Sequence, residues 1–386
     1  MKLLRFALIV LLCLSFPAFF TACGSTSSED GEGTAGTSGK AEVVTDSGDK
    51  SAGNSAENAS APSGESTSDV NAGGSSSGTD LSLTEVTLCE VAHSIFYAPQ
   101  YCAIELGYFE DEGIDLTLYN GSGADNVMTA LISGDADIGF MGSESSIYVY
   151  AQGATDYAVN FAQLTQRAGN FLVSRTDEAD FAWEDLVGAT VLGGRAGGMP
   201  QMIFEYILKQ HGIDPATDLT IIQNIDFGLT AAAFSNGTAD YTVEFEPFAT
   251  SLEAAGEGYV IASLGEESGY VPYTAYSVLK SYLAEHEDVI QAFTNAIQRG
   301  LDYVNSHTPE EIARVIAPQF SETDVDTLTT IVERYYEQDT WKEDTIFTQE
   351  AFELLEDILM EADELESAVS YEDLVTTVFS EKAIRQ

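Results

Sequence analysis

From residue 86 onwards, short runs of apolar residues alternate with segments whose apolar positions recur every three to four residues. The runs at 86–91, 114–118 and 138–141 are predicted strands, and the segments at 98–106 and 125–132 are predicted helices between them. Short strands separated by helices are typical of parallel sheets covered by helices. The pattern therefore predicts an α/β fold. Two further apolar runs, at 158–164 and 171–174, are predicted strands that end this first series of elements.

A second series repeats the same order. Its predicted strands are 190–192, 219–223, 241–245 and 259–262, and its predicted helices are 199–211 and 228–234. The segment ALISGDAD at 130–137 also matches AFSNGTAD at 233–240, at a constant offset of 103 residues. In each copy we expect the Gly to end a helix in the left-handed conformation and the Asp to precede the next strand. One repeated unit is therefore predicted to build two similar lobes.

The chain returns to the first lobe after Pro272. A strand is predicted at 273–279, and the segment from Ser281 onwards is predicted to be helical, with apolar residues at 289, 293, 297 and 301. We assign residues 81–177 and 270–386 to the first lobe and 178–269 to the second. Two α/β lobes joined by crossing segments form a hinged clamp, in which a ligand is held at the carboxyl ends of the strands.

The first 80 residues are predicted to lie outside this clamp. Lys2 and Arg5 precede an apolar stretch at 6–20, which is too short to cross a membrane and is typical of an export signal. The sequence TACG at 21–24 resembles the lipobox of bacterial lipoproteins, which predicts a signal peptide over 1–23 and lipidation of Cys23. The alternative is an ordinary secretory signal with an incidental cysteine. Residues 24–80 lack aromatic residues and are predicted to form a disordered Ser/Gly-rich tether.

Charge and cysteine usage exclude several classes of function. The 63 acidic residues outnumber 15 Lys and Arg, for a net charge of -48, and such a surface repels nucleic acid. Cys89 and Cys102 could form a disulfide, but two buried free thiols are the favoured prediction. The four histidines are scattered, so no metal site is predicted. Sequence signatures of a hydrolase or metalloprotease are absent as well, which argues against an enzyme.

Four ordered motifs carry a resemblance to a known family. They are FYAPQY at 96–101, AIELGYF at 103–109, EGID at 112–115 and SGDADIG at 133–139. Over roughly residues 84–305 the chain resembles the substrate-binding proteins of ABC importers for nitrate, alkanesulfonates, taurine and the pyrimidine precursor of thiamine. In the pyrimidine-binding branch a Trp often follows the first strand. The segment EVAHS at 90–94 has a His there and no Trp, which weakens a specific pyrimidine assignment.

The resemblance implies a fold, a set of partners and a location. It implies a periplasmic-binding-protein-like clamp of type II with a helical C-terminal tail. It also implies a monomer that delivers a small molecule to an ABC permease and its ATPase, without a cofactor and without chemistry on the ligand. Together with the signal, it predicts an extracytoplasmic protein held at the outer face of the cytoplasmic membrane by a lipid on Cys23. A sensor that presents its bound ligand to another protein is the alternative of a different class.

The predicted strand ends supply the candidate ligand-binding residues. After the first strand these are His93, Ser94, Phe96 and Tyr97, and Ser143 and Glu144 follow the strand at 138–141. At the start of a helix, Ser143 and nearby backbone amides would bind an oxygen of the ligand. The alternative for Ser143 is plain helix capping.

The second lobe supplies a glycine-rich turn, GGRAGGMP at 193–200. Its glycines allow close backbone approach, and its amides could form an anion-binding nest, with a simple tight turn as the alternative. The candidates from this turn are Arg195, Gly197 and Gly198, and Arg167 is added as a second arginine. Two arginines in the cleft would favour a carboxylate, sulfonate or phosphate.

Other candidates favour a different ligand. Three acids fall at predicted strand ends and would bind amino groups of a ligand: Asp226, Glu244 and Glu246. The alternative is that these acids only add to the charge of the protein surface. The aromatic residues Phe227, Tyr273 and Tyr276 suit stacking on a flat ring, although aromatic residues at strand ends also serve in cores. We therefore expect a nitrogen-bearing heterocycle, such as a pyrimidine or another vitamin precursor. The alternative ligands are an alkanesulfonate, taurine or nitrate.

Overall fold

The protein folds around two separate five-stranded sheets. The structure is a computed structural model that describes residues 83–225 and 228–385. The predicted signal, the tether and Cys23 lie outside the described residues, as do Asp226 and Phe227. No helix in the described part of the chain is long and apolar enough to cross a membrane.

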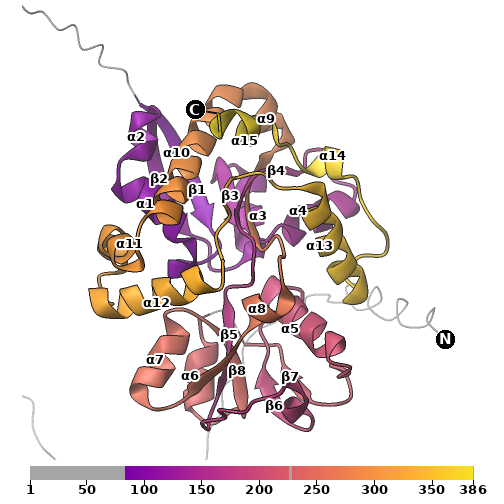
Figure 1. Cartoon of the computed structure of the whole chain (residues 1–386). Coiled ribbons are helices and arrows are strands. Elements are labelled where there is room, and N and C mark those ends of the chain that lie inside the picture. Colours follow the sequence, from indigo (N-terminus) through magenta and orange to yellow (C-terminus); the bar gives the residue numbers. More distant parts are fainter. Residues whose placement is uncertain (1–82, 226–227, 386) are drawn as a thin grey trace, which may run out of the picture. The chain divides into compact units, whose positions relative to one another are not determined.

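The first sheet has the order β2-β1-β3-β10-β4 (Figure 1). Its strands are β1 Thr84–Glu90, β2 Ile114–Asn120, β3 Ile138–Met141, β4 Ala158–Thr165 and β10 Thr274–Leu279. β1 pairs in parallel with β2 and β3, whereas β10 pairs antiparallel with both β3 and β4. The strands predicted from the apolar runs are therefore present, and the α/β class is confirmed.

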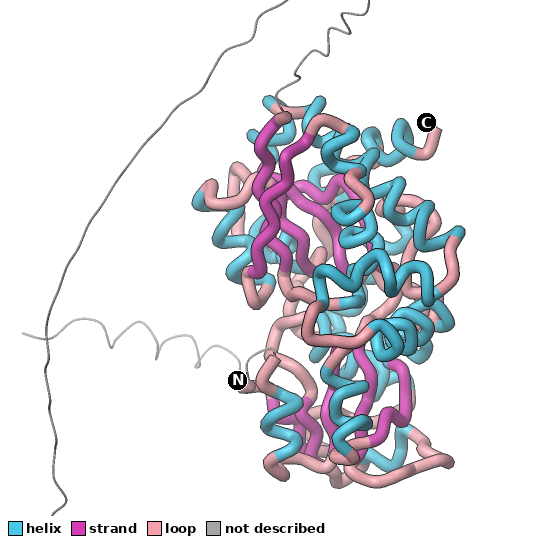
Figure 2. The backbone as a smooth tube through the Cα atoms, turned by 90° about the vertical axis from the view of Figure 1, so that its left-hand side faces the viewer, coloured by secondary structure: helices cyan, strands magenta, loops and turns pink. Residues whose placement is uncertain are grey.

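The second sheet has the order β7-β6-β8-β5-β9. Its strands are β5 Asn170–Ser174, β6 Thr190–Leu192, β7 Thr220–Ile222, β8 Tyr241–Phe245 and β9 Tyr259–Ser263. β6 pairs in parallel with β7 and β8, whereas β5 pairs antiparallel with β8 and β9. The two sheets thus share one topology, in which the fourth strand, β10 or β5, runs antiparallel to both of its neighbours. Figure 2 shows the sheets as two groups of strands, one above the other.

Two segments connect the lobes, at 166–169 between β4 and β5 and at 269–273 between α8 and β10. They are hydrogen-bonded to each other, because the amide of Val271 donates to the carbonyl of Gln166 at 2.8 Å. The predicted boundary at residue 177 is wrong, since β5 pairs within the second sheet. Hydrophobicity could not show this, because a buried strand has the same pattern in either sheet.

The repeated segments have the same structural role in both lobes. Gly134 ends a helix at φ 78°, and Gly237 follows the corresponding helix at φ 84°. Asp137 accepts a hydrogen bond from the amide of Thr87 at 2.8 Å, and Asp240 accepts one from the amide of Thr190 at 2.9 Å. These partners keep the offset of 103 residues seen in the sequence. The prediction that this motif is structural is confirmed.

Helices cover both sheets and continue into the C-terminal tail (Figure 1). They are α1 Ala98–Glu105, α2 Tyr108–Asp111, α3 Ala124–Ser133, α4 Glu144–Ala151, α5 Met199–Gln210, α6 Thr230–Ser235, α7 Phe248–Ala255, α8 Leu264–Ser268, α9 Lys280–Glu285, α10 Glu287–Ser306, α11 Pro309–Ile316, α12 Val325–Glu337, α13 Gln349–Glu361, α14 Tyr371–Leu374 and α15 Val378–Ala383. Short 3-10 turns lie at Ile95–Tyr97, Trp183–Leu186 and Ala317–Phe320.

The tail contacts both lobes. Helix α10 packs on α1 and α15, and it buries Phe293, Ile297 and Leu301 at the predicted spacing. Gly300 lies against the backbone of α1, where a Cβ would overlap a carbonyl oxygen. Helix α13 packs instead on α5 of the second lobe. The tail therefore bridges the clamp as well as covering the first lobe.

Both cysteines of the described chain are free and buried, as predicted. Cys89 lies in β1 and Cys102 in α1. Burial raises the pKa of both thiols, because the thiolate loses its hydration inside the protein. Neither residue has exposed surface in the folded protein.

Candidate ligand-binding cleft

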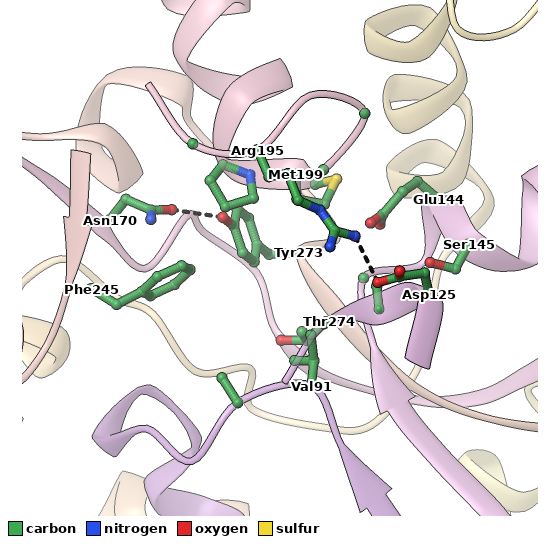
Figure 3. A pocket seen from close by; sticks show the side chains of 18 of the residues that line it. Val91, Asp125, Glu144, Ser145, Asn170, Arg195, Met199, Phe245, Tyr273 and Thr274 are labelled. Atoms are coloured by element: carbon green, nitrogen blue, oxygen red, sulfur yellow. Dashed lines mark hydrogen bonds and ion pairs between the residues drawn. The ribbon is translucent and has the colours of Figure 1, made fainter. Parts of the chain in front are cut away.

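A cavity of about 380 Å³ lies between the lobes, where strands of both sheets end. It is lined by the segment after β1, the starts of α3 and α4, and the second crossing. The glycine-rich turn before α5, the start of β5 and the end of β8 line it from the second lobe. Eight of the predicted site residues line this cavity: Ser94, Tyr97, Glu144, Arg195, Gly197, Gly198, Glu244 and Tyr273. Most of the lining is apolar or aromatic, with Val91, Met199 and Phe245 among the residues drawn in Figure 3.

Glu144 brings an unsatisfied carboxyl group into the cavity. It is the first residue of α4 and only 2% exposed, and its Oε2 atom has no hydrogen-bond partner among the described residues. Burial raises the pKa of this carboxyl to about 8, because the ionised form loses its hydration. A Cβ at Gly142 would overlap this carboxyl, so a larger residue there would displace the Glu144 side chain.

Glu244 brings a second buried carboxyl, from β8 of the other lobe. Its oxygens accept hydrogen bonds from the hydroxyls of Thr242 at 2.6 Å and Thr230 at 3.0 Å. Burial raises the pKa of Glu244 to about 7, although these two hydrogen bonds oppose the rise. Each lobe therefore contributes one acid whose ionised form would be stabilised by a donor or a positive charge on a ligand.

Tyr273 and Asn170 form a hydrogen-bonded pair in the cavity wall. The Tyr273 hydroxyl donates to Oδ1 of Asn170 at 2.6 Å, and both side chains are buried (Figure 3). Nδ2 of Asn170 has no partner among the described residues. Asn170 is not among the site residues predicted from the sequence. The available signal was a polar residue directly before the apolar run at 171–174.

The glycine-rich turn closes one side of the cavity. Arg195 donates from Nη2 to Oδ1 of Asp125 at 2.6 Å, which joins the turn to α3 of the first lobe (Figure 3). These side chains are 45% and 60% exposed, so the pair lies at the rim. Across the same gap the Tyr148 hydroxyl donates to the carbonyl of Gly197 at 3.4 Å. Asp125 is not among the site residues predicted from the sequence.

Backbone amides of this turn are already bonded within the second lobe. Those of Gly193 and Ala196 donate to the carbonyls of Ile222 and Gln223, and that of Gly197 donates to the Gln201 side chain at 2.9 Å. The Gly198 amide donates to the carbonyl of Arg195. Four amides of the expected anion-binding nest are therefore satisfied internally, which favours the alternative of a tight turn.

Six other predicted residues do not line the cavity: His93, Phe96, Ser143, Arg167, Glu246 and Tyr276. Three of them carry aromatic rings and belong to the packing of the first lobe. His93 binds Glu90 through Nδ1 at 2.8 Å, and Glu90 raises the pKa of this imidazole. Phe96 packs edge to face on Tyr273, and Tyr276 stacks on Phe140. For Phe96 and Tyr276 the alternative of a core role therefore applies.

The other three are used in structural contacts near the crossings. Arg167 donates to the carbonyl of Gly265 at 2.9 Å and covers the ring of Tyr270. Glu246 accepts from Nη1 of Arg334 at 2.7 Å. Ser143 does not cap α4, and its hydroxyl donates to the carbonyl of Pro272 at 3.2 Å. The capping alternative for Ser143 is therefore wrong.

Comparison with known proteins identifies the family. The model of the family described as NMT1/THI5 like matches residues 95–312. The chain belongs to the NMT1/THI5 like family. The matched segment of this NMT1/THI5 like protein contains Glu144, Asn170, Arg195, Glu244 and Tyr273. Over 300 residues it is 46% identical to a Bacillus subtilis (strain 168) protein named "Putative binding protein YtlA", covering 78% of this chain and 90% of that one.

Solved structures share the two-lobed architecture of this NMT1/THI5 like protein at low sequence identity. The alkanesulfonate-binding protein SsuA from Xanthomonas axonopodis pv. citri superposes with a TM-score of 0.63 at 15% identity, covering 76% of this chain and 99% of that chain. The nitrate-binding protein NrtA from Synechocystis PCC 6803 has a TM-score of 0.63 at 14% identity, covering 78% and 89%. These likenesses establish a periplasmic-binding-protein fold.

Proposed function

We propose that this protein is the extracytoplasmic substrate-binding component of an ABC importer. Its lobes close around a small organic nutrient and deliver it to a permease that is driven by a cytoplasmic ATPase. The family, the two-lobed fold and the interlobe cavity support this role. The export signal and the lipobox-like segment ending at Cys23 support anchoring at the outer face of the cytoplasmic membrane.

The ligand that fits the cavity is a flat heterocycle bearing nitrogen, such as an aminopyrimidine. The observation that carries this proposal is the pair of buried acids, Glu144 and Glu244, facing one cavity from opposite lobes. Each carboxylate accepts N–H donors, and a positively charged or strongly donating ring would lower the pKa of both acids. The aromatic and apolar walls suit the faces of such a ring.

Sulfonate and nitrate fit the same cavity less well. Arg195 is the one basic residue among its described lining residues, and it is half exposed and already paired with Asp125. An anion placed between Glu144 and Glu244 would meet two acids without a buried cation. The net charge of -48 adds a long-range repulsion of anions. Charge therefore favours the heterocycle over the anions bound by SsuA and NrtA.

Thermal melting of the protein against 4-aminopyrimidine, thiamine, taurine, methanesulfonate and nitrate tests this proposal. Binding to the folded state raises Tm by mass action, and we expect a rise with the nitrogen heterocycles alone. Glu144→Ala should abolish the rise, whereas Arg195→Gln should preserve it. A rise confined to the sulfonates or nitrate and lost in Arg195→Gln would refute the heterocycle assignment.

An ATPase assay with the permease present separates transport from sensing. A transport protein should stimulate the ATPase activity of a reconstituted importer in the presence of its ligand. A ligand-presenting sensor would bind the ligand with the same affinity and leave that ATPase unchanged.

A further inference from the structure

Asn170 places an unused hydrogen-bond donor in the cavity. It is the first residue of β5, directly after the first crossing, and it is 1% exposed. Its backbone is fixed in the second sheet opposite Phe245 of β8. Nδ2 nevertheless lacks a partner among the described residues. Because a buried donor without an acceptor is costly and uncommon in folded proteins, this atom points to a group supplied by a ligand.

Tyr273 determines which end of the Asn170 amide faces the cavity. Its hydroxyl occupies Oδ1 at 2.6 Å, so the NH₂ end remains for a ligand. The tyrosine ring is held edge to face against Phe96, with centroids 5.6 Å apart, and against Phe245 at 6.2 Å. Each member of the pair lies beside a different crossing between the lobes. The orientation of the amide is therefore built by packing at the hinge.

Glu144 supplies the opposite hydrogen-bonding character. Its unpartnered Oε2 also lines the cavity, and in Figure 3 Glu144 and Asn170 lie on opposite sides of Tyr273. When ionised, Glu144 accepts hydrogen bonds only, whereas Nδ2 of Asn170 only donates. A ligand that satisfies both must carry a donor at one edge and an acceptor at another.

We propose that Asn170, oriented by Tyr273, is a specificity-determining residue that selects ligands with an acceptor, either a ring nitrogen or a carbonyl oxygen. This inference rests on the proposed binding function and narrows its ligand class. Glu144 takes the N–H donor of the same ligand. Compounds with an amine but no acceptor are rejected, because they leave Nδ2 desolvated and unpaired. From the cost of such an unpaired group, we expect a discrimination of about 10- to 100-fold.

Two matched probes test this selection. 4-Aminopyrimidine carries an amine beside a ring nitrogen, whereas aniline has the same amine on a ring without nitrogen. Isothermal titration should give a Kd for 4-aminopyrimidine that is about 10- to 100-fold lower than that for aniline. In a ¹⁵N-labelled protein, the side-chain amide signals of Asn170 should shift with 4-aminopyrimidine and remain in place with aniline.

Substitutions then assign the discrimination to the pair. Asn170→Leu removes the donor at similar volume, and Asn170→Asp replaces it with an acceptor. Both should remove most of the preference for 4-aminopyrimidine over aniline. Tyr273→Phe keeps the ring and frees the amide to rotate, so it should reduce the preference several-fold. The matched control is Tyr276→Phe, which removes a buried hydroxyl that donates to Gln100 at 2.9 Å outside the cavity. It should leave the preference unchanged.

The possible results separate this inference from the proposed function. Unchanged preference in folded Asn170→Leu and Tyr273→Phe proteins, with 4-aminopyrimidine still binding, would overturn the role of Asn170 alone. Binding of taurine or nitrate with no heterocycle bound would overturn the proposed ligand class. In that case unchanged affinity for the anion in Asn170→Leu would overturn the donor role as well, and a tenfold loss would support it. Absence of binding by every probe would overturn both.

Discussion

The Glu144 carboxyl should make the stability of the ligand-free protein depend strongly on pH. Burial raises its pKa from the ordinary 4.5 to about 8. Between these two values the unfolded chain has lost the proton while the folded protein retains it. The free energy of unfolding therefore falls as the pH rises from about 4.5 to about 8. Replacement of Glu144 by Gln removes this dependence while keeping the shape of the side chain.

The expected size follows from that pKa. At about 1.36 kcal/mol per pH unit, the rise from 4.5 to about 8 corresponds to about 5 kcal/mol. Water that enters beside the carboxylate would reduce this value to about 3 kcal/mol. The stability advantage of Glu144→Gln over the natural protein should thus grow by about 3 to 5 kcal/mol between pH 4 and pH 9. Glu244, whose pKa is raised to about 7, contributes in the same direction in both proteins.

Urea unfolding monitored by circular dichroism at pH 4, 6, 7.5 and 9 measures this difference directly. Glu337→Gln, at an exposed position near the end of α12, is the control and should follow the natural protein at every pH. If the difference between Glu144→Gln and the natural protein stays constant across the range, burial does not hold the proton on this carboxyl. The reasoning about the cavity electrostatics would then be refuted.

Three further predictions concern packing, the rim of the cavity and the thiols. Gly300→Ala should lower the free energy of unfolding by about 1 to 3 kcal/mol, because the added Cβ would overlap a carbonyl oxygen of α1. An unchanged Tm would contradict this close contact. A double-mutant cycle of Asp125→Asn and Arg195→Gln should give a coupling free energy of unfolding below about 1 kcal/mol that vanishes in 1 M salt, since the pair is exposed. A coupling above about 2 kcal/mol would show instead that the pair is shielded from solvent. Cys89 and Cys102 should resist iodoacetamide until the protein unfolds, as mapped by peptide mass spectrometry, and rapid labelling of the native protein would contradict their burial.

Local patterns determined much of this architecture. The order of strands and helices, the two-lobed plan and the shared Asp137 and Asp240 motif follow from apolar periodicity and repetition along the chain. Glu144 and Glu244 could be proposed as cavity residues because the ends of parallel strands gather at one edge of a sheet. These inferences need only the position of a residue within its own element.

Tertiary structure alone decided which side chains face the cavity and which partners they have. Arg167 and Arg195 are equivalent as sequence signals, yet the first binds the carbonyl of Gly265 and the second lies at the cavity rim. Tyr273 meets Asn170 across 103 residues of chain, because the two crossing segments run side by side. The sheet to which a strand belongs and the direction of a side chain depend on contacts between distant segments. Hydrophobic periodicity carries no information about those contacts, so the selective pair at the hinge emerged only from the folded protein.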